Sequence, residues 1–140
     1  MLNAAIDILI NNSTVANLLG TDIDGDPKVY ANICPQVEKF PYVVLRISAR
    51  RPEDCKENMP TDYTYNFSAY CYCDSYAKVD ALSRSVEMAL SRESGNFDGV
   101  KITEIRYLDM ADEAVEISSS QVLHARRVDF EALVDENTAT

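Results

Sequence analysis

The stretch "YTYNFSAYCYCDSYAKVDALSRSVEMAL" (Tyr63–Leu90) decides the fold class, because it holds the clearest strand and the clearest helix of this 140-residue chain. Residues 63–73 alternate between two faces, as a β-strand does. Asp74 or Ser75 can then cap a helix whose apolar side chains recur every three or four residues up to Leu90. We therefore expect a strand that runs directly into a helix packed on its sheet.

Patterns on both sides of this stretch predict the remaining elements. One helix is expected from the helical spacing of the apolar residues Leu2, Ala5, Ile6, Leu9 and Ile10. A second, short helix is expected to carry Val15, Leu18 and Leu19, with Ser13 as its N-cap and Gly20 at its C-terminal end. Further strands are expected at residues 29–35, 41–50, 100–110 and 120–134, with polar connections at 51–62 and 111–118. Neighbouring strands joined by short loops should be antiparallel.

This order of elements predicts an α+β domain of two layers. We expect a mostly antiparallel sheet of four to five strands, with the N-terminal helix and a central helix packed on one face. The chain length fits one domain. That domain is expected to span residues 1–134, with a flexible C-terminal tail at residues 135–140.

The last two predicted strands depart from strict alternation. Each contains one step of three residues between apolar side chains, where a strand has steps of two. The step runs from Ile102 to Ile105 in the first strand and from Ala125 to Val128 in the second. A single irregularity of this kind would indicate a β-bulge.

Two such irregularities at one level suggest a larger feature. If the strands form a hairpin that turns near residues 115–116, residue 104 lies opposite residue 127 and the two irregular steps coincide. We therefore expect residues 105–126 to form a protruding C-terminal β-hairpin arm that leaves the main sheet and packs against another molecule.

The charge of the chain limits its function. Its formal net charge is −10, which argues against a protein that binds nucleic acid by neutralising phosphates. A negative surface instead suits a channel through which DNA slides. No apolar run approaches the ~18 residues of a membrane span. The start "MLNAAIDILINNS" lacks the basic region of a secretory signal, so we expect synthesis in the cytosol, where the four cysteines would be reduced thiols.

Cys71 and Cys73 are the residues that most resemble a reactive site. On a strand they lie on one face with their Cα atoms roughly 6.6 Å apart, and their parallel side chains disfavour a disulfide. A zinc site would need two more ligands from Cys34, Cys55 and His124. Because cysteine packs well as a small apolar residue, we favour core packing over metal binding or redox chemistry.

Other catalytic and metal-binding patterns are incomplete. Asp22, Asp24 and Asp26 resemble the start of a calcium loop, but the sixth and twelfth positions hold Pro27 and Ile33 in place of glycine and glutamate. Turn chemistry explains this segment. His124, the only histidine, has no nucleophile elbow to work with. We therefore predict no enzyme activity, no metal and no cofactor.

Protein interfaces are better supported than chemistry. Tyr70 and Tyr72 lie on the strand face opposite the cysteines and suit a subunit contact, although they could equally cover the second face of the sheet. Cys55 is a candidate for an interchain disulfide. The full set of interface candidates is Arg50, Arg51, Glu53, Asp54, Lys56, Tyr70, Tyr72, Asp109, Asp112, Glu113, Glu116 and Arg126.

The layout as a whole resembles a known family. An N-terminal helix leads to "FPYVVLRIS", the strand "YTYNFSAYCYC" runs into "DSYAKVDALSRSVEMAL", and a final hairpin ends in "HARRVDFEALV". Over residues 2–134 this resembles the tail-completion, or tail-terminator, proteins of long-tailed bacteriophages and prophages.

The resemblance implies an α+β subunit assembled as a homo-oligomer, often a hexameric ring, on the head-proximal end of the tail tube. Such a ring ends tube growth and binds the tail tube protein and the head–tail connector or neck proteins, while DNA passes through its lumen. It also implies no enzyme activity, no cofactor and a place in the virion, assembled in the host bacterial cytoplasm. The alternatives are another neck component, such as a head-completion protein, or a non-viral ligand-binding α+β domain.

Overall fold

The computed structural model describes residues 1–21, 25–32, 41–52, 62–97, 99–118 and 121–135, with the backbone alone for 114–118 and 121–123. The helices are α1 (Leu2–Ile10), α2 (Ser13–Leu19) and α3 (Tyr76–Leu90). The strands are β1 (Val29–Ala31), β2 (Tyr42–Pro52), β3 (Asp62–Cys73), β4 (Gly95–Phe97), β5 (Val100–Ser118) and β6 (Gln121–Asp135).

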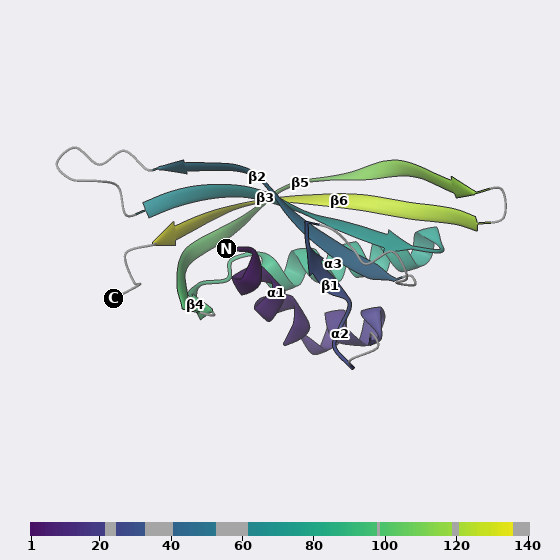
Figure 1. Cartoon of the computed structure of the whole chain (residues 1–140), viewed down its shortest axis with the longest axis horizontal. Helices are drawn as coiled ribbons and strands as arrows, with labels where there is room; N and C mark the ends of the chain where they lie inside the picture. Colours follow the sequence, from purple (N-terminus) through teal and green to yellow (C-terminus); the bar gives the residue numbers. More distant parts are fainter. Residues whose placement is uncertain (22–24, 33–40, 53–61, 98, 119–120, 136–140) are drawn as a thin grey trace.

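The described elements form two layers. One is a six-stranded sheet in the order β1-β2-β3-β6-β5-β4, and the helices lie on one of its faces (Figure 1). The other face of the sheet has no helix over it among the described residues. The predicted α+β class is confirmed, but the predicted four to five strands are too few. The extra strand, β4, has only three residues and no alternation that the sequence could reveal.

The ends of the helices follow from local capping. Ser75 caps α3, because its side chain accepts a hydrogen bond from the backbone N–H of Lys78 at 3.3 Å. The prediction that Ser13 caps α2 was wrong by one residue, since Asn12 accepts from the N–H of Val15 at 3.1 Å. Gly20 ends α2 with φ of 71°, a conformation that glycine adopts without strain.

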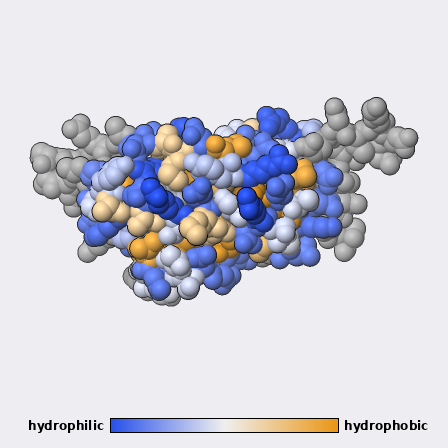
Figure 2. All heavy atoms as spheres, turned by 180° about the vertical axis from the view of Figure 1, so that it is seen from behind, coloured by the Kyte–Doolittle hydropathy of each residue, from blue (hydrophilic) through white to orange (hydrophobic). Residues whose placement is uncertain are grey.

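The core lies between the helices and the sheet. At its centre Phe67 of β3 stacks on Phe130 of β6, with ring centroids 5.3 Å apart. Cys71 and Cys73 are buried in the same layer as free thiols, which confirms their predicted place on the core face. The molecular surface seen in Figure 2 mixes hydrophilic residues with small apolar patches.

The sheet departs from the expected antiparallel order at one edge. β1 pairs with β2 in parallel, with Val29 opposite Val43. This pair departs from the antiparallel pairing expected for neighbouring strands, whereas the other strand pairs are antiparallel, as predicted for most of the sheet. β2 also contains a bulge between Ile47 and Ala49, which moves Ala49 to the face opposite the helices.

The predicted centre of the final hairpin was wrong. β5 continues to Ser118 and β6 begins at Gln121, so residues 111–118 are strand, not a loop. Glu104 lies opposite Leu133, not opposite Arg127 as expected. The irregular step in β5 is a real bulge between Ile102 and Glu104.

The irregular step in β6 has a different cause. Alternation in β6 is unbroken, because β3 pairs with it residue by residue from Asp62↔Asp135 to Cys73↔His124. Arg126 simply occupies a core-facing position where an apolar side chain was expected. The predicted arm of residues 105–126 therefore does not leave the sheet. Only the hairpin end, from Val115↔Leu123 to Ser118↔Gln121, extends past the last pair with β3.

Candidate functional site

The sheet face opposite the helices, here called the open face, carries the two predicted tyrosines. Tyr70 and Tyr72 of β3 are half-buried on it. The guanidinium of Arg46 lies 5.3 Å from the centre of the Tyr70 ring, and the Tyr72 ring lies 5.0 Å from that of Tyr42. The tyrosines thus cover the second face and contact β2, while part of each ring stays accessible.

Paired charges occupy the middle of the open face. Arg127 of β6 forms ion pairs with Glu113 of β5 at 2.8 Å and with Asp129 at 3.1 Å. Asp129 also accepts a hydrogen bond from Ser68 at 2.6 Å. These residues border a shallow groove of about 460 Å³, lined on β5 by Leu108 and Asp109. Ligand sites are usually deep and mostly apolar, so this open, charged groove suits a protein contact better.

Arg126 lies on the core-facing side of β6, where its hydrogen bonds connect the β5–β6 hairpin to α3. Its guanidinium donates to Asp80 at 2.6 Å and Asp112 at 2.8 Å, and to the hydroxyls of Tyr76 at 3.0 Å and Ser83 at 3.2 Å. Burial opposes its charge, but the hydrogen bonds raise its pKa above the ordinary value, so the group stays protonated. Arg126 is therefore buried within the subunit, and its role as an interface residue stays a prediction.

The thiols are poorly suited to chemistry. Burial raises the pKa of Cys73 to about 11, and burial raises that of Cys71 further. Cys73 lies opposite His124, whose ring meets Tyr76 edge-on at 6.4 Å. No group of three His, Cys, Asp or Glu side chains among the described residues could hold a metal ion. Cys34 and Cys55 lie outside the described residues.

The outer edge of β5 is uncovered along most of its length. β4 pairs only with Val100–Ile102, and Ile105 bonds to the backbone of residues 92 and 93. Beyond Ile105 no described strand pairs with this edge. The N–H of Met110 donates to the carboxylate of Asp109 at 2.8 Å, as an edge amide without a strand partner would.

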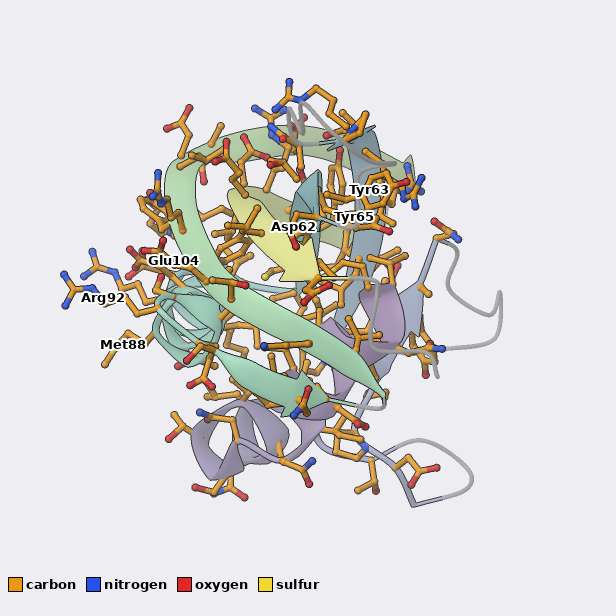
Figure 3. The ribbon with its side chains drawn as sticks, turned by 90° about the vertical axis from the view of Figure 1, so that its left-hand side faces the viewer. Asp62, Tyr63, Tyr65, Met88, Arg92 and Glu104 are labelled. Carbon is orange, nitrogen blue, oxygen red and sulfur yellow. The ribbon has the colours of Figure 1, made fainter. Side chains whose placement is uncertain are left out.

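Acidic residues are concentrated on this β5 edge. Asp109, Asp112 and Glu113 lie along it with exposed or half-exposed side chains. Glu116 belongs to the same strand, opposite Val122, although only its backbone is described. A second shallow groove, of about 520 Å³, runs between this strand and the end of α3, beside Met88, Arg92 and Glu104 (Figure 3).

At the opposite corner of the sheet, the outer edge of β2 beyond Leu45 has no strand partner among the described residues. β1 pairs with Val43–Leu45 only, and no described strand continues along Arg46–Pro52. This edge is basic. Arg46, Arg50 and Arg51 are exposed on it, and Arg50 stacks at 3.7 Å on the ring of Tyr63, which Figure 3 shows beside Tyr65. Arg51 donates to the side chain of Asn66 at 3.1 Å.

The structure thus divides the predicted interface residues between these two edges and the open face. The basic candidates Arg50 and Arg51 lie on β2, and the acidic candidates Asp109, Asp112, Glu113 and Glu116 lie on β5. Glu53, Asp54, Cys55 and Lys56 lie outside the described residues. The sequence did not identify Arg46 as an interface candidate, because Arg46 lies in a strand with a strong apolar pattern. Its charge was the only available signal.

The fold and these surfaces define a class: a two-layer α+β subunit with an open sheet face and two uncovered edges. The chain matches no family model and no curated protein. Among solved structures it is similar to a chain in the structure titled "Virion of native gene transfer agent (GTA) particle". The TM-score is 0.73 at 19% identity, and the match covers 96% of this chain and 94% of that chain. The two chains therefore share one fold over nearly their whole lengths. In the described part of the chain, no helix is long and apolar enough to span a membrane.

Proposed function

We propose that this protein is a structural component of a phage-like virion. It forms a ring on the head-proximal end of the tail tube, ends tube growth and joins the tail to the neck, and DNA passes through the ring. The observation that carries the proposal is the whole-length fold likeness to a chain of a gene transfer agent virion. The resemblance of residues 2–134 to tail-terminator proteins narrows the role within the particle.

Several features of the subunit support assembly over catalysis. The polar groups of the open face are paired with one another, as Arg127 is with Glu113 and Asp129. The two buried thiols have raised pKa values, which disfavour the reactive thiolate. Uncovered sheet edges on both sides offer surfaces for neighbouring subunits. The partners in this proposal are other copies of the chain, the tube protein and the neck proteins.

The experiment that tests this role uses purified protein and tail tubes. Native mass spectrometry should detect a closed ring, with six subunits as the expected number. Electron microscopy should place added protein at one end of each tube, and tubes grown without it should vary widely in length. A protein that remains monomeric and never binds tube ends would refute the proposal.

The runner-up role is a different neck component, such as a head-completion protein. It would bind the portal side of the neck and leave tube length unchanged, so the same micrographs separate the two roles. A ligand-binding domain is less well supported, because the two grooves on the open side of the sheet and between β3, β5 and β6 are shallow and bordered by charged side chains such as Arg127, Asp129 and Glu131.

A further inference from the structure

We propose that the acidic edge of β5 in one subunit pairs with the basic edge of β2 in the next, so that neighbouring sheets join into one. This inference rests on the proposed ring and specifies how its subunits bind. The occupant of each edge is therefore a second copy of this chain.

The charges of the two edges favour unlike over like pairing. β5 carries Asp109, Asp112 and Glu113 along its uncovered edge, whereas β2 carries Arg46 and Arg51. Two β5 edges would bring carboxylates together, and two β2 edges would bring guanidinium groups together. Like charges directly opposite each other destabilise a strand pair, and opposite charges stabilise it. A contact between unlike edges is head-to-tail, which generates a ring when the rotation closes.

Strand direction is compatible with this contact. β2, β3, β6 and β5 are antiparallel to one another in turn, so β5 runs opposite to β2. When a copy is rotated about an axis roughly along the strands, its β2 meets the first copy's β5 as an antiparallel pair. The joined sheet then keeps the hydrogen-bonding pattern of each subunit.

The short outer strands limit where the contact can form. β1 covers β2 at Val43–Leu45, and β4 covers β5 at Val100–Ile102, which are diagonally opposite corners of the sheet. Without an offset the uncovered segments share only the levels from Arg46 to Ala49 on β2 and from Asp109 to Arg106 on β5, so a longer pairing requires neighbouring copies to be offset along the strands. Closed sheets require such an offset, because their strands tilt relative to the axis of the ring.

The position of β1 also defines the register between β5 of one copy and β2 of the next. The longest pairing that stops short of β1 places the hairpin end, Ser118, opposite Arg46. The distance along each bulged strand is counted on its regular partner strand. Arg46 pairs with Ser68 and Arg51 pairs with Thr64, and these two partners are four residues apart in sequence. Gln121 and Ala125, the partners of Ser118 and Glu113, are also four residues apart. Arg51 of one copy then lies opposite Glu113 of the next.

This register is consistent with the faces of the sheet. Arg51 lies opposite Thr64 and Glu113 lies opposite Ala125, and all of these residues belong to the open face. Opposite residues in an antiparallel pair project from the same face, so the two charges can meet. Glu113 can turn to Arg51 without leaving Arg127 unpaired, because Arg127 also binds Asp129.

A charge-swap experiment tests the pairing. Arg51→Glu places a carboxylate opposite Glu113 of the next copy, and Glu113→Lys places an ammonium group opposite Arg51. Each variant alone should associate at least about tenfold more weakly than the wild type, since like charges now face each other. In an equimolar mixture, contacts between the two different variants again pair opposite charges at these positions. Native mass spectrometry should therefore find alternating rings with equal numbers of each variant.

Arg84→Glu is the matched control. Arg84 is an exposed arginine of α3 that, like Arg51, makes an exposed polar contact with a described residue, in this case with Asp80 at 3.2 Å. Its reversal should leave ring formation unchanged. Circular dichroism melting of all three variants separates a loss of assembly from a loss of folding.

Each outcome decides a different claim. If the wild type forms rings and either edge variant alone does so equally well, the edge pairing is wrong and the proposed function stands. The pairing is also wrong if both variants fail alone and their mixture does not recover rings. If the wild type forms no ring, alone or on tail tubes, both the function and the pairing are refuted.

Discussion

Arg126 of β6 lies 2.6 Å from the carboxylate of Asp80 in α3, and this ion pair connects the sheet to its covering helix. The same guanidinium reaches Asp112 of β5 at 2.8 Å. One side chain therefore joins three elements that are far apart in sequence. Its own side chain is only 7% exposed, whereas that of Asp112 is 62% exposed, so solvent reaches the anions more than the cation.

Replacing Arg126 should destabilise the subunit more than any surface change. Arg126→Ala removes the donor of four hydrogen bonds, and we expect a cost on the order of 2 kcal/mol in the free energy of unfolding. Arg126→Lys keeps the charge but cannot reach all of these acceptors, so an intermediate cost is expected. Urea unfolding measures both, with Arg84→Ala as an exposed control. Equal stability of all three variants would contradict the linking role of Arg126.

The Arg126–Asp80 pair should also appear in the pH dependence of stability. The hydrogen bond from Arg126 lowers the pKa of Asp80 in the folded state. A depressed carboxyl pKa contributes stability that is present above the unfolded pKa of ~3.9 and is lost as the pH falls through the folded pKa. Urea unfolding between pH 6 and pH 2 should show wild type more stable than Asp80→Asn at pH 6. The gap should narrow at low pH, and a gap independent of pH would argue against the assignment.

The buried thiols should resist alkylation. Burial raises the pKa of Cys73 to about 11 and raises that of Cys71, so neither forms an appreciable thiolate near pH 8. Iodoacetamide at pH 8 should leave both unmodified in the folded protein and modify both in urea. Peptide mass spectrometry measures each site separately. Rapid modification of Cys71 in the native state would show that the β3–α3 layer opens readily.

The cap of α3 should depend on Ser75 and not on its neighbour. Ser75→Ala removes the acceptor for the N–H of Lys78 and should cost about 1 kcal/mol. Asp74 makes only an exposed ion pair with Lys78 at 3.2 Å, so Asp74→Ala should cost less than about 0.5 kcal/mol. Thermal unfolding of the two variants compares them directly. A larger effect at Asp74 than at Ser75 would show that Asp74, and not Ser75, caps α3.

The end of the β5–β6 hairpin should be dispensable for folding. Replacing residues 116–122 by an Asn-Gly turn between Val115 and Leu123 removes only pairs that lie beyond the last contact with β3. The melting temperature should stay close to that of the wild type, while ring formation weakens. Deleting residues 109–120 should instead unfold the subunit, because that deletion removes Asp112, a partner of Arg126. Intact assembly after the shorter deletion would show that the tip makes no subunit contact.

The sequence predicted most of the secondary structure, because periodicity is a local property. The alternation in Tyr63–Cys73 and the stripe of α3 follow directly from which side chains are apolar. The same alternation placed Cys71 and Cys73 on the core face with parallel side chains, which disfavours a disulfide between them, and both are free thiols in the structure. The short strands β1 and β4 have three residues each, too few for a period to define their partners or direction.

The surfaces for assembly depended on tertiary structure. Arg126 looks like a surface residue in the sequence, since charge normally favours solvent. Its burial becomes favourable through Asp112 of β5 and through acceptors on the distant helix α3, among them Asp80. The two uncovered edges likewise exist because of sheet order, which places β2 and β5 on opposite sides and the short strands at opposite corners. The sequence by itself determined the strands, helices and core face, because these depend on residues near in the chain. Strand order, the burial of Arg126 and the opposite charges of the two edges were decided only by tertiary structure, because they depend on contacts between residues far apart in it.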